Sequence, residues 1–148
     1  MARIRLVGTI PLGWIVDAYR RPNASCSVLE ESIYKLPEPA RCRAQDTVHK
    51  LLTLAYKQAP DGSKRPLLPD SRPLHDQRGL FEIAKGQLRF FWIHWTHVRT
   101  HVPHYNVMLL LDVVEKKTRK LHPDVIRQMS RLRREALANY RGPLSLAV

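Results

Sequence analysis

The chain has 148 residues, of which 44% are hydrophobic and 26% charged, with 25 lysines and arginines against 13 aspartates and glutamates. This length and apolar fraction fit one folded domain with its own core and argue against a disordered chain. The formal charge of +12 favours association with polyanions such as RNA or DNA. A membrane-binding helix is the alternative, and it would need a strongly amphipathic basic segment.

The cysteine count and the N-terminus bear on the cellular compartment. Cys26 and Cys42 are too few for a disulfide framework or a cysteine-rich zinc site. We expect both to be reduced, partly buried thiols in the cytosol. Residues 1–19 resemble a signal peptide only faintly, because Pro11 and Gly13 interrupt the apolar run and no cleavage pattern follows. No apolar stretch has the length of a transmembrane helix, so we expect no membrane partner.

The first half of the chain is expected to supply strand material and two helices. Residues 3–7 and 13–19 are rich in β-branched, aromatic and other large apolar side chains, which indicates one strand or two short ones. The segment 59–73 contains four prolines and a glycine and is predicted to be a loop.

A helical hairpin is predicted between these segments. Ser27 lies three residues before Glu30, which is the spacing of a capping box, and the apolar pattern that follows predicts a short helix that Pro37 ends. A second helix is predicted over residues 39–58, where apolar side chains recur at helical spacing after a proline suited to a first turn.

The second half of the chain is expected to form the sheet. Residues 80–84 and 88–95 are predicted to be antiparallel strands joined by a tight turn at residues 85–86. A polar connector, residues 94–105, then leads to residues 107–114. That last segment is almost continuously apolar, which indicates an interior strand covered on both faces.

A C-terminal helix completes the predicted fold. Pro123 suits its first turn, and Gly142 and Pro143 stop it. The elements together predict an α/β (α+β) fold: a small twisted, mainly antiparallel sheet of about four strands, with an N-terminal helical hairpin and a C-terminal helix. We expect a single domain over residues 1–148.

Positive charge is concentrated at one end of this predicted sheet. Four cations, Lys116, Lys117, Arg119 and Lys120, follow the apolar strand directly, and Arg89 lies in the neighbouring strand. Most charge runs are simply solvated. A run attached to a buried strand is nevertheless fixed in space, so these cations can form a site.

Arg89 is a charged residue in an otherwise apolar strand, where its guanidinium requires a partner or a function. Either it pairs with Glu82 across the predicted hairpin, or it points into a shared cationic pocket.

Arg72 and His75 lie in the loop before the hairpin, where they can be surface residues or functional ones. No nucleophile motif, phosphate loop or paired-carboxylate pattern is present. An active site here would therefore be cationic and act on an anionic substrate.

A histidine cluster offers a different kind of site. It comprises His94, His97, His101 and His104. Imidazole is the commonest protein ligand of zinc, but the segment contains no carboxylate or cysteine partner. A solvated polar loop is the alternative.

Several of these motifs together resemble one protein family. The order R-P-L-H-D-x-x-G-L-F-E-I, K-G-Q-L-R-F-F-W-I, V-M-L-L-L-D-V-V-E-K-K-T-R-K and then a basic helix that starts with proline resembles the RelE/HigB toxin superfamily. Its phage Gp49-like branch is the nearest match, over about residues 28–140. The resemblance implies the toxin of a type II toxin–antitoxin pair, a cytoplasmic endoribonuclease that cleaves mRNA on the ribosome. It implies no metal or cofactor, and an antitoxin partner that is often a helix-turn-helix DNA-binding protein.

The resemblance also assigns roles to particular residues. Catalytic roles fall on Arg72, His75, Arg89, Lys116 and Lys117. Substrate-binding roles fall on Glu82, Lys85, Arg119 and Lys120. Arg89 would stabilise the phosphate, His75 would be the general acid or base, and Glu82 would orient Arg89.

The chain departs from the family pattern in several places. Ala84 stands where relatives carry an arginine, which weakens the cation set, and Asp112 and Glu115 add negative charge. The connector over residues 94–105 is longer than in relatives, and residues 141–148 extend past the last helix. The alternative function is therefore a non-catalytic basic protein of a phage or mobile element that binds nucleic acid or a host protein.

Overall fold

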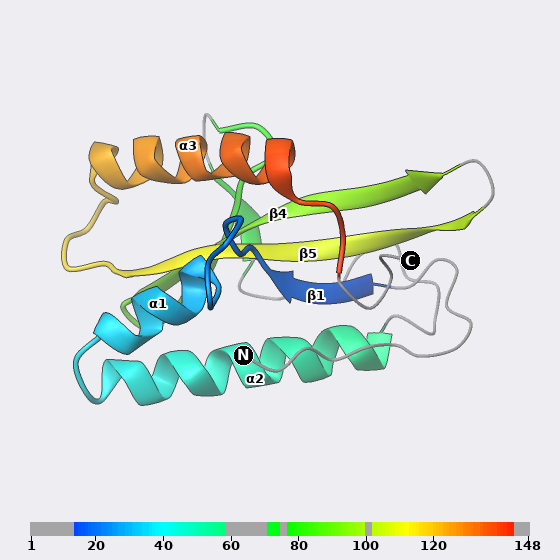
Figure 1. Ribbon diagram of the computed structural model, residues 1–148. Coiled ribbons are helices and arrows are strands. Elements are labelled where there is room, and N and C mark those ends of the chain that lie inside the picture. Colours follow the sequence, from blue (N-terminus) through cyan, green and yellow to red (C-terminus); the bar gives the residue numbers. More distant parts are fainter. Residues whose placement is uncertain (1–13, 59–70, 75–76, 100–101, 144–148) are drawn as a thin grey trace.

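Helices cover both faces of one sheet in the computed structural model, which describes residues 14–58, 71–74, 77–99 and 102–143 (Figure 1). The fold is α+β. Within the described residues, the strands are β1 (Trp14–Ala18), β2 (Ser71–Pro73), β3 (Phe81–Lys85), β4 (Leu88–Arg99) and β5 (Val102–Glu115). The helices are α1 (Val28–Lys35), α2 (Ala40–Gln58) and α3 (Pro123–Asn139).

The sheet is open and mixed, with the strand order β1-β5-β4-β3-β2. The β3–β4 hairpin and the β4–β5 pair are antiparallel, as predicted. The prediction of about four mainly antiparallel strands holds in part: most pairings are antiparallel, but the sheet has five strands and includes one parallel pair. β1 pairs with β5 in parallel, from Trp14 opposite Asn106 to Ala18 opposite Leu110. The fifth strand, β2, lies in the segment predicted to be a loop, because a three-residue edge strand that contains a proline has no apolar alternation to reveal it.

The two longest strands, β4 and β5, form a hairpin that extends beyond the end of α3 (Figure 1). The predicted polar connector over residues 94–105 was therefore wrong, because β4 continues to Arg99 and β5 already begins at Val102. Backbone hydrogen bonding across adjacent strands requires no apolar side chains. Exposed polar residues such as His94 and Thr96 are consequently tolerated within the strand.

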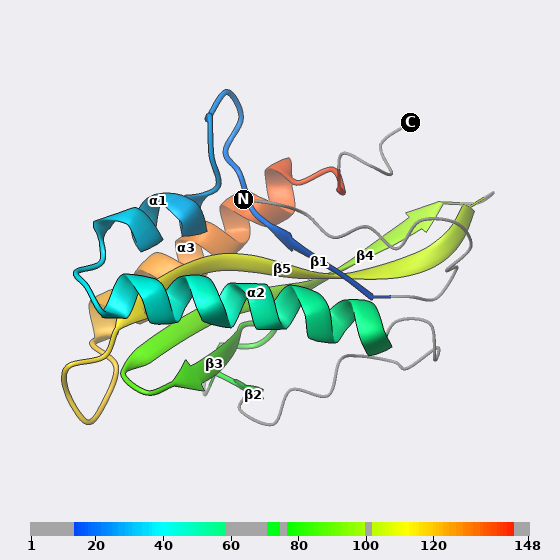
Figure 2. The same ribbon diagram turned by 90° about the horizontal axis from the view of Figure 1, so that it is seen from below.

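The core consists of two apolar clusters, one on each face of the sheet. Leu29 and Ile33 of α1 and Ala44 and Val48 of α2 pack on the face that carries Phe90. The other face is covered by α3, whose buried residues are Met129, Leu132 and Ala136. Figures 1 and 2 show the same division, with α3 on one side of the sheet and α2 on the other. Each large side chain buried in this way contributes about 1.5–3 kcal/mol.

β5 is an interior strand of the sheet, between β1 and β4. Met108 and Leu110 belong to the cluster under α1 and α2, whereas Val107 and Leu109 belong to the cluster under α3. All four are fully or almost fully buried. The prediction of an interior strand covered on both faces is thus confirmed.

The predicted helix starts are confirmed by their capping contacts. The hydroxyl of Ser27 accepts a hydrogen bond from the Glu30 backbone N–H at 3.0 Å at the start of α1. α3 begins at Pro123, and the Nδ1 atom of His122 accepts from the Asp124 N–H at 3.1 Å. These bonds satisfy backbone donors that a helix leaves free in its first turn.

A β-bulge interrupts the pairing of β4 with β5. Phe91 lies opposite Asp112, but the next residue, Trp92, lies opposite Leu110, so that Leu111 is the extra residue. Leu111 packs in the cluster under α3. A bulge of this kind re-aims side chains, and here it interrupts the simple alternation of faces at Asp112.

Two further expectations concern the cysteines and the membrane. Cys26 is half-buried, whereas Cys42 is exposed, so the expectation of partly buried thiols is wrong for Cys42. Among the helices of the described ranges, none is both long and apolar enough to cross a membrane.

Candidate functional site

Arg72 and Glu82 form an ion pair between the two outermost strands at one edge of the sheet. They are directly opposite in the β2–β3 register. Glu82 Oε1 lies 2.8 Å from Nε and 2.7 Å from Nη2 of Arg72. The Glu82 side chain is 3% exposed and that of Arg72 66%, so a buried carboxylate holds an arginine that reaches into solvent.

This pairing corrects the role expected for Glu82. The sequence suggested that Glu82 pairs with Arg89 or orients it, but Arg89 lies opposite Ala84 on β3 and Val114 on β5. Its Nη1 atom donates to the carbonyl oxygens of Gly86 at 2.7 Å and of Leu88 at 2.9 Å. The Arg89 guanidinium is therefore anchored on the β3–β4 turn.

Two buried polar atoms of this region have no hydrogen-bond partner among the described residues: Glu82 Oε2 and Arg89 Nε. Glu82 lies opposite Phe91, two positions from Arg89 along β4, so both side chains are on one face of adjacent strands. An unpaired buried donor or acceptor costs about 1–3 kcal/mol. Such atoms call for an explanation, for example a water molecule, an ion or a catalytic role. Glu82 Oε2 can accept a hydrogen bond and Arg89 Nε can donate one, so each atom has capacity for a further polar partner.

The lysine-rich segment after β5 is held against the same end of the sheet. The Lys116 N–H donates to the Gln87 carbonyl at 2.6 Å, which ties this segment to the β3–β4 turn. Lys116 is half-buried, whereas Lys117 and Lys85 are exposed. Figure 2 shows the β3–β4 turn and the β5–α3 connection at one end of the molecule. The cations of three adjacent strands therefore converge there.

The remaining cations of the predicted site lie further along the connection to α3. Arg119 and Lys120 are exposed. The Thr118 hydroxyl donates to the Lys120 carbonyl at 2.6 Å and so shapes this short segment. Both side chains are available to a polyanion, and neither has a geometry that selects a particular one.

Some predicted functional residues lie outside the described residues. They include His75, the expected general acid or base, and the side chains of His97, His101 and His104. His94 is exposed, and its Nε2 lies 3.1 Å from the Thr96 hydroxyl. The zinc hypothesis thus remains a prediction.

Sequence reasoning missed a second polar region, which lies between α1 and α3. Its buried member is Asp112, whose Oδ1 accepts from the Val113 N–H at 2.8 Å. Burial raises the pKa of Asp112, and hydrogen bonds from Ser32 and from Val113 oppose that rise in part. The only sequence signal was an acidic residue within an otherwise apolar strand.

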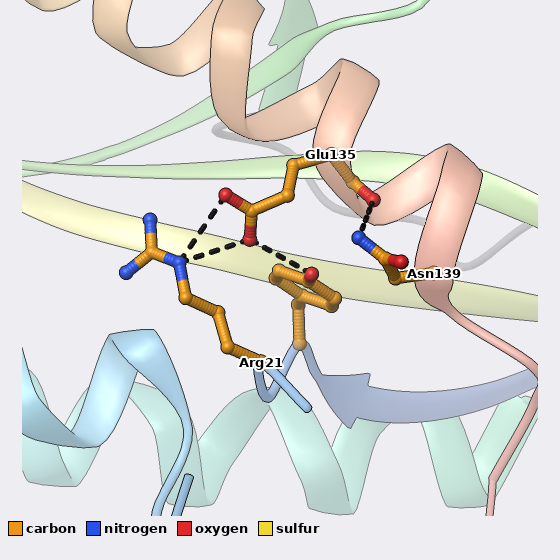
Figure 3. A network of polar contacts seen from close by, with 4 residues as sticks. Arg21, Glu135 and Asn139 are labelled. Atoms are coloured by element: carbon orange, nitrogen blue, oxygen red, sulfur yellow. Dashed lines mark hydrogen bonds and ion pairs between the residues drawn. The ribbon is translucent and has the colours of Figure 1, made fainter. Parts of the chain in front are cut away.

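An ion-pair network on α3 borders this second region (Figure 3). Glu135 lies 2.9 Å from Arg21 Nε and also accepts from the Tyr19 hydroxyl at 2.8 Å. The Glu135 backbone carbonyl accepts a hydrogen bond from the side-chain amide of Asn139 at 3.0 Å. Burial, followed by the hydrogen bond to Glu135, raises the pKa of Tyr19. The network fixes Arg21 against α3.

Comparison of the sequence with models of protein families gives no match, and a search of curated proteins gives none either. The residues themselves and their motif resemblance to RelE/HigB toxins are thus what bears on the function of this chain. Of the two polar regions, the cationic end of the sheet contains most of the residues that this resemblance implicates.

Proposed function

We propose that this chain is the toxin of a type II toxin–antitoxin system and that it cleaves mRNA on the ribosome without a metal ion. One observation carries the proposal: Lys85, Arg89 and Lys116 converge at one end of three neighbouring strands, and Arg72 lies on the next strand along. The motif resemblance to RelE/HigB toxins implicates these same positions. A cationic site without paired carboxylates suits charge stabilisation on RNA.

The proposed reaction is an attack of the ribose 2′-oxygen on the adjacent phosphorus. A bond forms between the 2′-oxygen and phosphorus, and the bond from phosphorus to the 5′-oxygen breaks. One proton leaves the 2′-hydroxyl and one is delivered to the 5′-oxygen. Arg89 and Lys116 would stabilise the negative charge of the phosphorane. His75 would transfer a proton, and Glu82 would hold Arg72 toward the RNA.

Arg89→Ala provides the main test, because it removes the cation at the centre of the site. The wild-type chain should arrest growth when expressed, and mRNA in a translation reaction should be cut at the ribosomal A site. Arg89→Ala should reduce cleavage by about 10²–10³-fold, the loss typical of one transition-state donor. Arg134→Ala, which alters an exposed residue of α3, is the matched control. Unchanged cleavage by a folded Arg89→Ala protein would contradict the site assignment.

A toxin of this type requires a neutralising partner. We propose a cognate antitoxin, often a small helix-turn-helix DNA-binding protein, encoded next to this chain and acting in the cytoplasm. Inspection of the neighbouring reading frame is the first experiment. Co-expression of the protein that it encodes should restore growth, and that protein should co-purify with the chain. A neighbour that does neither would contradict this part of the proposal.

The second candidate function is nucleic-acid or host-protein binding without catalysis. Two observations favour it: Ala84 reduces the cation set, and the Arg89 Nη1 atom is already engaged by two backbone carbonyls. The in vitro translation assay separates the two functions. RNA that is bound but stays intact at saturating protein would favour the second.

A further inference from the structure

A pocket of about 430 Å³ lies between α1 and α3, apart from the cationic end of the sheet. Its volume is within the range of ligand pockets, about 300–1,000 Å³. Asp112 of β5 lines it and is 8% exposed. Ser32 of α1 and Arg131 of α3 line its walls. The pocket is thus a polar cavity with a buried carboxylate.

The charges that line the pocket largely pair with one another. Arg21 is paired with Glu135 at 2.9 Å, and Lys35 with Glu31 at 3.4 Å. In the described part of the chain, neither Asp112 nor Arg131 forms a salt bridge. Asp112 already accepts hydrogen bonds from the Val113 N–H and from Ser32, but the two oxygens of a carboxylate offer about four acceptor positions. The groups left for a ligand are therefore the remaining acceptor positions of this buried carboxylate and the exposed Arg131 guanidinium.

This residual pattern restricts the chemistry of a ligand. A basic peptide side chain would suit Asp112 but would meet Arg21, Lys35 and Arg131. A simple anion would suit Arg131 but would approach three carboxylates. A ligand with neutral hydrogen-bond donors at one end and an anionic group at the other satisfies both. Nucleotides have this form, since a base edge can meet the carboxylate while the phosphate meets the arginine.

We propose that this pocket binds a guanine nucleotide, with the base edge on Asp112 and the phosphate on Arg131. Guanine presents two adjacent donors, N1–H and N2–H, that match the two oxygens of a carboxylate. Adenine and cytosine offer only an amino group on that edge, as in the contact of a carboxylate with cytosine N4. Uracil has one N–H between two carbonyl oxygens that repel a carboxylate. The proposal does not rest on the proposed mRNA cleavage.

Titration calorimetry of the full chain with guanosine 5′-monophosphate, and separately with uridine 5′-monophosphate, tests the proposal. Guanosine monophosphate should bind at least about tenfold more tightly, as expected for a bidentate base contact. Asp112→Asn should remove most of this preference. Arg131→Ala should weaken both nucleotides, whereas Arg134→Ala, on the exposed side of the same helix, should weaken neither. Arg131 is itself exposed, so its substitution keeps the test valid if Asp112→Asn does not fold.

A second titration identifies the source of the nucleotide. It uses a short single-stranded RNA that contains one guanosine and a matched RNA in which uridine replaces it. Binding of guanosine monophosphate itself supports a free nucleotide. A guanosine-dependent affinity for the RNA alone, lost in Asp112→Asn or Arg131→Ala, supports a nucleotide within a strand. The proposal is overturned if no guanine ligand binds up to millimolar concentration or if neither substitution changes the affinity.

These titrations contain no ribosomes, so their outcome is separate from that of the cleavage assay. A chain that cleaves mRNA but binds no guanine ligand would lose only the pocket proposal. A chain that binds guanosine monophosphate but leaves mRNA intact would lose only the proposed cleavage.

Discussion

Arg72 and Glu82 share one ion pair but not one environment: the glutamate side chain is almost fully buried, whereas the arginine side chain is two-thirds exposed. The cost of burying the carboxylate is thus offset by a cation that water still reaches. Removing the arginine should therefore lower the stability of the fold more than removing the glutamate, because an unpaired buried charge is far more costly than an unpaired exposed one.

We therefore expect Arg72→Ala to destabilise the fold by about 1–3 kcal/mol, since it leaves Glu82 without this partner. Glu82→Gln keeps an acceptor of similar shape without the charge and should cost less. The double variant should be more stable than Arg72→Ala alone. Urea unfolding at constant pH and salt measures all three. Equal stability of Arg72→Ala and the wild type would show that water replaces the arginine.

Asp112 should give the stability of the protein a distinctive pH dependence. Because its pKa is raised in the folded state, the folded chain binds this proton more tightly than the unfolded chain. The resulting stabilisation is fully present below the ordinary carboxyl pKa, about 4, and is lost as pH rises through the raised value. Asp112→Asn removes this loss, so its stability relative to the wild type should increase from about pH 4 upward.

Urea unfolding across a pH series measures this difference. Asp46→Asn, which alters an exposed aspartate of α2, serves as the control and should give a curve parallel to the wild type. Arg21 and Glu31 also act on the Asp112 carboxyl, so salt should be held constant. A pH-independent difference between Asp112→Asn and the wild type would contradict the prediction.

The Tyr140 hydroxyl joins the end of α3 to β1 through a buried hydrogen bond of 2.7 Å to Asp17 Oδ2. Tyr140→Phe should cost about 1.5–3 kcal/mol, as is typical for a hydrogen bond to a charged group. The edge-on ring contact with Trp95 should survive. Thermal and urea unfolding should both detect the loss. Tyr34→Phe, at a residue that is 67% exposed, should change stability by less than about 0.5 kcal/mol.

Ser27 caps α1 through the 3.0 Å bond that its hydroxyl accepts from the Glu30 N–H. Ser27→Ala should destabilise the protein by about 1 kcal/mol, the usual cost of a lost N-cap. Ser27→Thr keeps the hydroxyl and should recover part of that loss. Ser25→Ala, two residues earlier and exposed, is the matched control. Equal unfolding midpoints for Ser27→Ala and Ser25→Ala would mean that the cap contributes nothing.

Elements governed by neighbouring residues could be predicted from the sequence. The capping pair of Ser27 and Glu30, the proline at the start of α3 and the β3–β4 hairpin all depend on contacts within a few residues. The convergence of Arg89 with Lys116 was also predictable in outline, because both lie at the ends of strands that are consecutive in the chain.

Only the tertiary structure decided which distant residues meet. The parallel pairing of β1 with β5 joins segments about ninety residues apart, and no local pattern specifies its register. Glu82 pairs with Arg72 rather than with Arg89 because β2 pairs with β3 at the edge of the sheet and places Arg72 opposite Glu82. β2 is too short to be recognised from the sequence. The placement of Asp112 beside α1 and α3 likewise depends on a bulge and on the packing of two helices. Local sequence set the elements, while strand register and helix packing set the chemistry between them.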